Sequence, residues 1–108
     1  MKQDKLLGLL GMARRANRLA AGVEDIVSAA AKGKCRAVLI ASDISENSLK
    51  KLTNSCEYYK VEIHGISYTK EELGSALGLA AVGAVGINDA GFYKAYKKMI
   101  HTSAVQDK

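Results

Sequence analysis

The chain has 108 residues, of which 48% are apolar, 25% charged and 6% aromatic. This size and composition are typical of one globular domain with an aliphatic core, and they exclude a disordered chain. No apolar run approaches the roughly 20 residues of a membrane span, and the stretch at 6–10 lacks the length and cleavage pattern of a signal peptide. We therefore expect one cytoplasmic, monomeric domain over residues 1–108, with a core at about 4–101 and a flexible tail at 102–108.

The net charge of +5 is concentrated near the N-terminus. Up to Arg36 there are eight basic residues and three acids, whereas from Ala37 onward eight lysines balance eight acids. With a pI near 9.3, this asymmetry favours a polyanionic partner, because Lys and Arg gain affinity by releasing counterions from phosphates. Nucleic acid is favoured over a membrane surface, since no helix combines a basic face with a bulky apolar face. A solvated basic surface without a partner is the alternative.

Helical and strand patterns alternate along the chain, with no proline to interrupt them. Apolar faces and capping residues indicate the helices, and short apolar or alternating runs indicate the strands. In chain order we expect a helix at 3–16, a brief strand at 19–21, a helix at 23–32 ending at Gly33, and a strand at 38–41. A helix capped by Ser45 and a strand at 61–64 follow. The rest of the chain is expected to form a short helix with a Thr69–Glu72 capping box closed by Gly78, a small apolar segment at 82–87, and a last helix capped by Asn88 or Asp89.

Each predicted helix has one apolar face that should contact the core. Alternation of such helices with strands predicts the α/β class, with one sheet covered by helices on both faces. The core-facing residues are expected to be Leu6, Leu9, Leu10 and Ala13 in the first helix, Val23, Ile26, Val27 and Ala30 in the second, Leu49, Leu52, Cys56 and Tyr59 in the third, Leu73, Ala76 and Leu77 in the fourth, and Phe92, Tyr96 and Met99 in the last.

No pattern indicates catalysis or a metal site. His64 and His101 lie in no recognisable catalytic setting. Cys35 and Cys56 are distant in sequence from each other and from both histidines, so we expect buried thiols rather than zinc ligands or a redox pair. The glycines in 78–86 lack the Lys and Ser or Thr of a P-loop. We therefore predict no enzyme activity, no cofactor and no metal.

Two pairs of neighbouring carboxylates lie in the first turns of predicted helices, where the helix macrodipole favours acids. This explanation suffices for Glu71 and Glu72. Glu24 and Asp25, however, lie within the basic third of the chain, where an acid weakens phosphate binding unless it contacts bases. We therefore consider Glu24 and Asp25 candidate binding residues.

Three segments carry a resemblance to a known family: Gly-Val-Glu-Asp-Ile-Val at 22–27, Val-Leu-Ile-Ala-Ser-Asp at 38–43 and, most specifically, Leu-Gly-Ser-Ala-Leu-Gly at 73–78. Together they resemble the ribosomal-protein family of L7Ae and L30e, and among its members the small bacterial ones. The similarity covers roughly 6–100. It implies a three-layer α-β-α sandwich with a mixed four-stranded sheet. It also implies a ribosome-associated RNA-binding protein that recognises kink-turns, RNA helices bent at a bulge beside tandem sheared G·A pairs.

The resemblance also implies which residues contact RNA. In that family the N-terminus of the second helix enters the RNA groove, and a glycine there lets the backbone approach closely. A carboxylate at this helix start can accept from the Watson–Crick edge of a sheared guanine. The corresponding positions are Gly22, Val23, Glu24, Asp25 and Ser28 at the helix, Leu79, Ala80, Ala81 and Val82 in an apolar loop against an extruded nucleotide, and Arg14, Arg15, Arg18, Lys32, Lys34 and Arg36 on phosphates.

Two positions depart from the family pattern. Glu24 replaces an Asn and can accept but not donate, and Ser28 replaces a basic residue, so we expect weaker binding that depends more on the flanking Lys and Arg. Two other functions are compatible with the sequence: a substrate-recognition partner of an RNA-modifying enzyme, and a protein-interaction module with no specific RNA target.

Overall fold

The computed structural model describes the backbone of residues 2–106 and the side chains of residues 5–100. The predicted order and type of the elements are confirmed within this range. The elements are α1 (Lys2–Arg15), β1 (Leu19–Ala21), α2 (Val23–Ala31), β2 (Ala37–Ile40), α3 (Glu46–Tyr59), β3 (Glu62–Gly65), α4 (Lys70–Ala76), β4 (Ala84–Ile87) and α5 (Ala90–Gln106). Helix α5 continues past residue 101, where the core was expected to end. Residues 107 and 108 of the expected tail lie outside the described range, and the tail's flexibility stays a prediction.

The four strands form one mixed sheet in the order β1-β4-β2-β3. Strand β4 is antiparallel to β1 and β2, whereas β3 is parallel to β2. Strands β1 and β3 are therefore the two edges of the sheet. The register brings Ala21, Ile40, Gly65 and Ala84 to one end of the sheet, called here the Gly22 end. Leu19, Ala37, Glu62 and Ile87 lie at the opposite end, called the Arg36 end.

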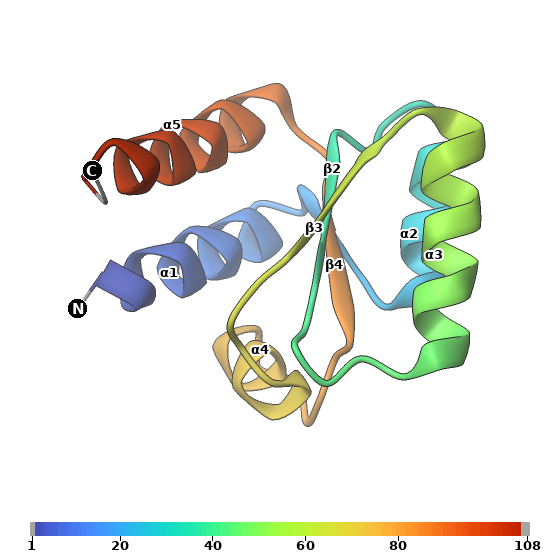
Figure 1. The fold of residues 1–108 in the computed structure, drawn as a ribbon, viewed down its shortest axis with the longest axis horizontal. Helices are drawn as coiled ribbons and strands as arrows, with labels where there is room; N and C mark the ends of the chain where they lie inside the picture. The colour runs from blue at the N-terminus through green and yellow to red at the C-terminus, as the bar shows by residue number, and fades with distance from the viewer. Residues whose placement is uncertain (1, 107–108) are drawn as a thin grey trace.

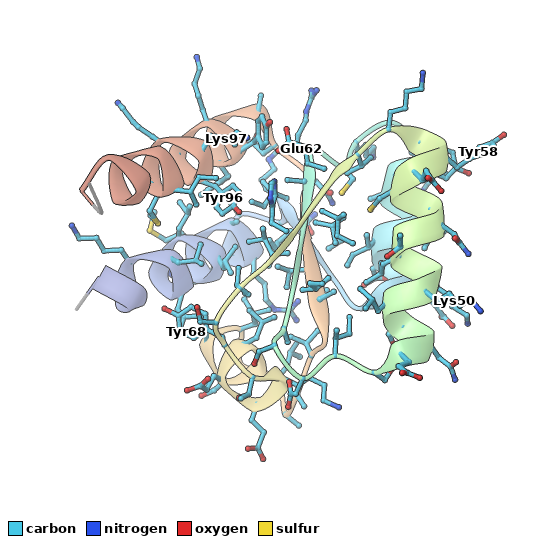
Figure 2. All side chains as sticks on the ribbon, in the orientation of Figure 1. Lys50, Tyr58, Glu62, Tyr68, Tyr96 and Lys97 are labelled. Atoms are coloured by element: carbon cyan, nitrogen blue, oxygen red, sulfur yellow. The ribbon has the colours of Figure 1, made fainter. Side chains whose placement is uncertain are left out.

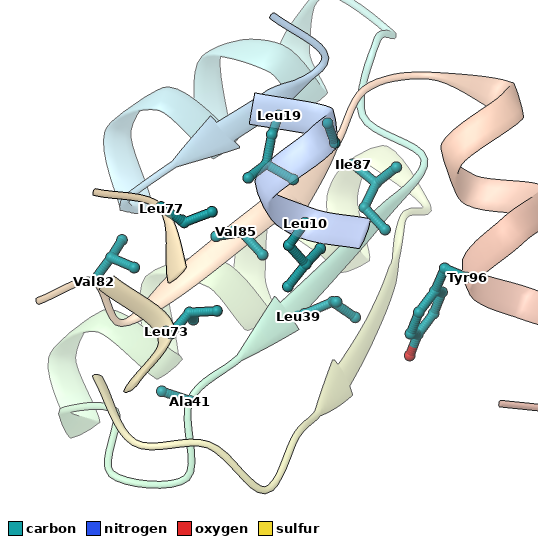
Figure 3. Packing of buried hydrophobic residues seen from close by; sticks show 11 residues of the cluster. Leu10, Leu19, Leu39, Ala41, Leu73, Leu77, Val82, Val85, Ile87 and Tyr96 are labelled. Atoms are coloured by element: carbon teal, nitrogen blue, oxygen red, sulfur yellow. The ribbon is translucent and has the colours of Figure 1, made fainter. Parts of the chain in front are cut away.

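Helices cover both faces of the sheet, as the alternating pattern predicts. Helices α1, α4 and α5 lie on one face, and α2 and α3 lie on the other (Figure 1). Between α1, α4, α5 and the sheet lies one hydrophobic cluster, which includes Leu10, Leu39 and Tyr96 (Figure 3). A second cluster, which includes Ile26 and Leu52, lies under α2 and α3. The chain is thus a three-layer α-β-α sandwich with two cores.

Both cysteines are free and buried in the second cluster, which confirms the prediction of core thiols. Burial raises the pKa of the Cys35 thiol to about 11, with a smaller contribution from Cys56. Burial also raises the pKa of Cys56. Because the thiolate is the reactive form, neither side chain is suited to nucleophilic chemistry at neutral pH.

The predicted apolar face of α3 is only half right. Leu52 and Cys56 are buried, but Leu49 is 37% exposed and Tyr59 is 38% exposed. A helix of 14 residues is roughly 21 Å long, whereas a strand of four residues spans only about 13 Å. The two ends of the helix therefore extend beyond the sheet that they were expected to cover.

Three helices begin with the caps that the sequence predicts. Ser45 caps α3 and accepts from Ser48 N, and Thr69 and Glu72 form a reciprocal capping box on α4. Asp89, rather than Asn88, caps α5, because Phe92 N donates to Asp89 Oδ2 over 2.9 Å. None of the helices in the described range is long and apolar enough to cross a membrane.

Candidate nucleic-acid interface

Helix α2 begins at Gly22, at one end of the sheet. Gly22 has φ 95° and ψ 158°, a region of backbone conformation that essentially only glycine adopts. Its N–H donates to Ala84 O over 3.0 Å, which ties the start of α2 to β4. No side chain of the described residues caps this helix, so the first-turn N–H groups face outward without the partner that α3, α4 and α5 have.

The side chains of the first two turns of α2 divide into two sets. Glu24, Asp25 and Ser28 are exposed, as a contact with RNA would require. Val23 is half-buried and packs against the second core cluster. The contact expected of Val23 is therefore restricted mainly to its backbone.

A polar hollow of ≈ 470–500 Å³ lies on each side of strand β1. The first, called the α2 groove, runs along the exposed side of α2. It brings together five of the predicted residues with four that were not predicted for the site. Its volume is ≈ 500 Å³. Its lining is Asn17, Arg18, Ala20, Asp25, Ser28, Ala29, Lys32, Lys34 and Asn88.

The second hollow, called the α1–α4 groove, lies between the C-terminal ends of α1 and α4. Its volume is ≈ 470 Å³ and it contains Arg14 and Arg15 beside Leu77 and Gly78. Asn17 lines both grooves, so the two basic surfaces meet at the turn between α1 and β1. Asn17 has φ 61°, a left-handed conformation that asparagine tolerates after a helix better than most residues.

The predicted apolar loop lies between α4 and β4, and it depends on Gly74. A Cβ at Gly74 would lie 2.7 Å from Ala81 Cα and 2.9 Å from Ala81 N, so only glycine lets the loop pack directly on α4. Leu79 N donates to Gly74 O over 2.8 Å. These contacts explain physically why the segment 73–78 contains glycine at this position.

Within this loop, the expectation for Val82 needs correction. Ala80 and Ala81 are exposed and Leu79 is half-buried, but Val82 is only 8% exposed and belongs to the first core cluster. The Val82 side chain packs inward because it lies two residues before the buried strand β4. Only the segment 79–81 presents side chains to a ligand.

Arg36 and Glu24 line neither groove. Arg36 is exposed at the start of β2, where its N–H donates to Ile87 O over 2.7 Å. Its side chain therefore lies at the Arg36 end, while the helix start with Glu24 lies at the Gly22 end. The predicted residues thus occupy a band along the β1 edge rather than one compact pocket.

Sequence reasoning missed two polar residues of the α2 groove, Asn17 and Asn88. Asn17 could have been found, because asparagine after a predicted helix is typical of a left-handed turn that exposes its side chain. Asn88 was considered only as a helix cap. Its position beside Lys32 and Lys34 depends on the pairing of β1 with β4, which no local pattern encodes.

A third polar cluster lies at the opposite edge of the sheet, between β3 and α5 (Figure 2). The Tyr93 hydroxyl donates to Glu62 Oε2. Glu62 Oε1 lies 2.9 Å from His64 Nε2 and 3.1 Å from Lys97 Nζ. The hydrogen bonds from Tyr93, then His64 and Lys97, lower the pKa of Glu62 to about 2. In the described range no group of three or more His, Cys, Asp or Glu is suited to holding a metal ion.

Comparison with known families gives a match over nearly the whole fold. The model of the ribosomal protein L7Ae/L30e/S12e/Gadd45 family matches residues 4–97. The chain belongs to this family. The resemblance inferred from the segments at 22–27, 38–43 and 73–78 is therefore confirmed.

Two curated relatives share about a third of the sequence. RNA-binding protein YlxQ of Bacillus subtilis (strain 168) is 33% identical over 84 residues, which are 78% of this chain and 83% of the relative. RNA-binding protein YlxQ of Enterococcus faecium is 32% identical over 98 residues, 91% of this chain and 93% of the relative. Both names are those of RNA-binding proteins rather than enzymes, in agreement with the expectation of no catalysis.

Solved structures support the same fold. A protein of unknown function from Bacillus halodurans C superposes with a TM-score of 0.79 at 33% identity, covering 88% of this chain and 95% of that one. The 15.5kD RNA binding protein of Giardia lamblia superposes with a TM-score of 0.74 at 19% identity, covering 94% of this chain and 86% of that one. The predicted sandwich architecture is thereby confirmed.

Proposed function

We propose that this protein binds structured RNA and recognises kink-turns with the start of α2. One observation carries the proposal: an uncapped helix start has two exposed carboxylates, one of which, Asp25, lines a basic groove that meets a second basic groove at Asn17. The names of the YlxQ relatives as RNA-binding proteins support the same class of partner. The proposal includes ribosomal RNA as a target, ribosome association and action in the cytoplasm.

The start of α2 has the chemistry that a bent RNA requires. The free first-turn N–H groups and the helix dipole favour a phosphate, and the absence of a Cβ at Gly22 lets the backbone approach it. Glu24 and Asp25 can accept from the N1–H and N2–H₂ groups of a sheared guanine, which a Watson–Crick pair would occupy. Specificity for sheared G·A pairs would therefore depend on acids within a basic surface.

The two grooves would supply affinity that does not depend on the RNA sequence. Arg14 and Arg15, beside Leu77 and Gly78, would contact one stem, and Lys32 and Lys34 would contact the other. Lys32 lies one helical turn after Ser28 in the same groove, so it can supply the positive charge that Ser28 lacks. By stabilising the bent conformer, the protein would shift an RNA equilibrium without chemistry.

The decisive experiment compares two RNAs. A kink-turn RNA and the same RNA with its G·A pairs converted to Watson–Crick pairs are titrated with the protein by calorimetry at one salt concentration. We expect clearly tighter binding of the kink-turn, because only that RNA presents unpaired guanine edges. Equal affinities would remove kink-turn recognition and leave only electrostatic attraction.

A second experiment tests the carboxylates. Replacing both Glu24 and Asp25 by Ala should weaken kink-turn binding, although it makes the protein more basic. The matched control replaces the exposed Glu46 and Glu57 of α3 by Ala, which changes the charge equally and should leave binding unchanged or slightly tighter. Tighter binding of the Glu24 and Asp25 variant would show that these acids only stabilise the helix.

A further inference from the structure

Asn88 lies in the α2 groove and is fixed by the backbone on both sides. Its own N–H donates to Arg18 O over 2.9 Å, which joins the end of β4 to the residue before β1. The next residue, Asp89, caps α5. The Asn88 backbone is thus held at a junction of three elements.

The Asn88 side-chain oxygen has an unusual environment. Oδ1 is buried and has no hydrogen-bond partner among the described residues. A buried acceptor without a partner destabilises a folded protein, and native structures keep few of them. Because Asn88 is also part of a groove wall, a rotation of its side chain toward the groove would let a donor on a bound ligand satisfy this oxygen.

The groups around Asn88 indicate the chemistry of that ligand. Arg18, Lys32 and Lys34 are exposed cations in the same groove, and Asp25 is the one acid in its lining. Arg18 Nε lies 3.8 Å from Asp89 Oδ1, a long and largely solvated contact that leaves most of the guanidinium available. The groove therefore offers several donors for an anion beside one acceptor for a neutral donor group.

A ribonucleotide unit combines these two features, because its phosphate is flanked by ribose hydroxyl and base amino donors. We propose that the α2 groove binds one ribonucleotide of the RNA, with its phosphate facing Arg18, Lys32 and Lys34 and a hydroxyl or amino group donating to Asn88 Oδ1. Asn88 is then a specificity-determining residue outside the helix start. This inference rests on the proposed RNA binding and adds a contact that kink-turn recognition by α2 does not require.

The test replaces Asn88 by Ala and measures both RNA affinity and thermal stability. Loss of one ligand hydrogen bond should weaken binding of the kink-turn RNA about tenfold. The melting temperature should stay constant or rise, because the unpaired buried acceptor is removed. Asn54→Ala, on the exposed side of α3, is the matched control and should leave affinity unchanged.

The outcomes separate this inference from the proposed function. Unchanged affinity of the Asn88→Ala variant overturns the inference even if wild type prefers the kink-turn. If wild type binds both RNAs equally, a loss of affinity for both in the variant still supports the groove contact. A melting temperature that falls while affinity is retained assigns Asn88 a purely structural role and overturns the inference.

Two additions keep the test decisive. Should Asn88→Ala not fold, Asn88→Asp keeps the size of the side chain, and its negative charge beside a phosphate should reduce affinity further. Unaltered binding by a folded Asn88→Asp variant overturns the inference.

Adenosine 5′-monophosphate and its 2′-deoxy form serve as competitors of the RNA. Weaker competition by the ribonucleotide in the Asn88→Ala variant than in wild type supports the inference, and equal competition in both proteins overturns it.

Discussion

At the β3 edge of the sheet, Glu62 is surrounded by Tyr93, His64 and Lys97, whereas at the β1 edge Arg18, Lys32 and Lys34 line an open groove. Both edges collect charged side chains from segments far apart in the sequence. At the β3 edge the charges are paired within the molecule. At the β1 edge the one ion pair found in the described range is the 3.8 Å contact of Arg18 with Asp89.

The difference indicates how the two edges are used. At the β3 edge, Glu62 at the start of the strand is connected to Tyr93 and Lys97 of α5, so these paired groups stabilise the fold. Cations without close acidic partners repel one another unless an external anion neutralises them. The β1 edge is therefore the surface suited to a polyanion, in agreement with the concentration of net charge before Ala37.

The largest expected effect follows from removing the charge at the β1 edge. Removing the cation from one phosphate should reduce the salt slope of RNA binding by roughly 0.7 to 0.9. Replacing Arg18, Lys32 and Lys34 together by Ala should thus lower affinity about a hundredfold at ~0.1 M salt, or ~2.7 kcal/mol. The measurement is a series of titrations with kink-turn RNA at increasing salt concentrations.

The matched control removes three lysines elsewhere. Lys50 and Lys51 lie on the exposed side of α3 and Lys94 on that of α5, and Lys50 projects away from the sheet (Figure 2). Replacing these three by Ala changes the net charge equally but should leave the salt slope nearly unaltered. Equal slopes for the two triple variants would mean that only net charge matters and would remove the distinction between the edges.

The next largest effect on RNA binding and stability is expected from adding a side chain at Gly74, where the 79–81 loop packs on α4. Gly74→Ala would bring a Cβ to 2.7 Å from Ala81 Cα, so the 79–81 loop must move. We expect a decrease of about 1–3 kcal/mol in the free energy of unfolding, together with weaker RNA binding, measured by urea denaturation and titration. Gly65→Ala, at the β3 edge, has nothing within 4 Å of its Cβ and should have little effect on either. A neutral Gly74→Ala variant would show that the loop can shift freely.

Much of the fold could be predicted from the sequence, because its signals are local. The Thr69–Glu72 capping box and the apolar run of β2 identified their elements directly. The wrong predictions concern side chains whose burial depends on tertiary packing rather than on the local sequence. Leu49 and Tyr59 continue the apolar face of α3, yet they extend past the short strands, and Val82 was assigned to a contact loop although it packs inward before β4.

The candidate site was predicted less completely for a related reason. Residues of α2 were found because Gly22, Glu24 and Asp25 are adjacent in sequence and carry the family pattern. The pairing of β1 with β4 brings Asn88 beside Arg18, and no sequence pattern shows that pairing. The basic residues were predicted as one group, and only the folded chain separates Arg36 from the two grooves.

A smaller effect is expected at the β3 edge. Glu62→Gln keeps a hydrogen-bonding side chain but removes the charge that Lys97 contacts. Because the Glu62 side chain is 38% exposed, solvent screens the interaction, and the loss of stability should be about 0.5–1 kcal/mol. RNA affinity should stay unchanged, since this cluster lies at the opposite edge from the grooves. A tenfold loss of RNA affinity in this variant would place part of the RNA interface at the β3 edge.

The smallest expected effect is the pH dependence of the difference in unfolding free energy between wild type and the Glu62→Gln variant. The pKa of Glu62 is lowered from 4.5 to about 2 in the folded protein, so the folded state binds fewer protons there than the unfolded chain. The stability from Glu62 is therefore fully present above pH 4.5 and is lost progressively as pH falls toward 2. The difference in unfolding free energy between wild type and Glu62→Gln should therefore shrink as the pH is lowered from 4.5 toward about 2, measured by urea denaturation. A difference that grows as pH falls would mean that protonated Glu62 is the form stabilised by Tyr93.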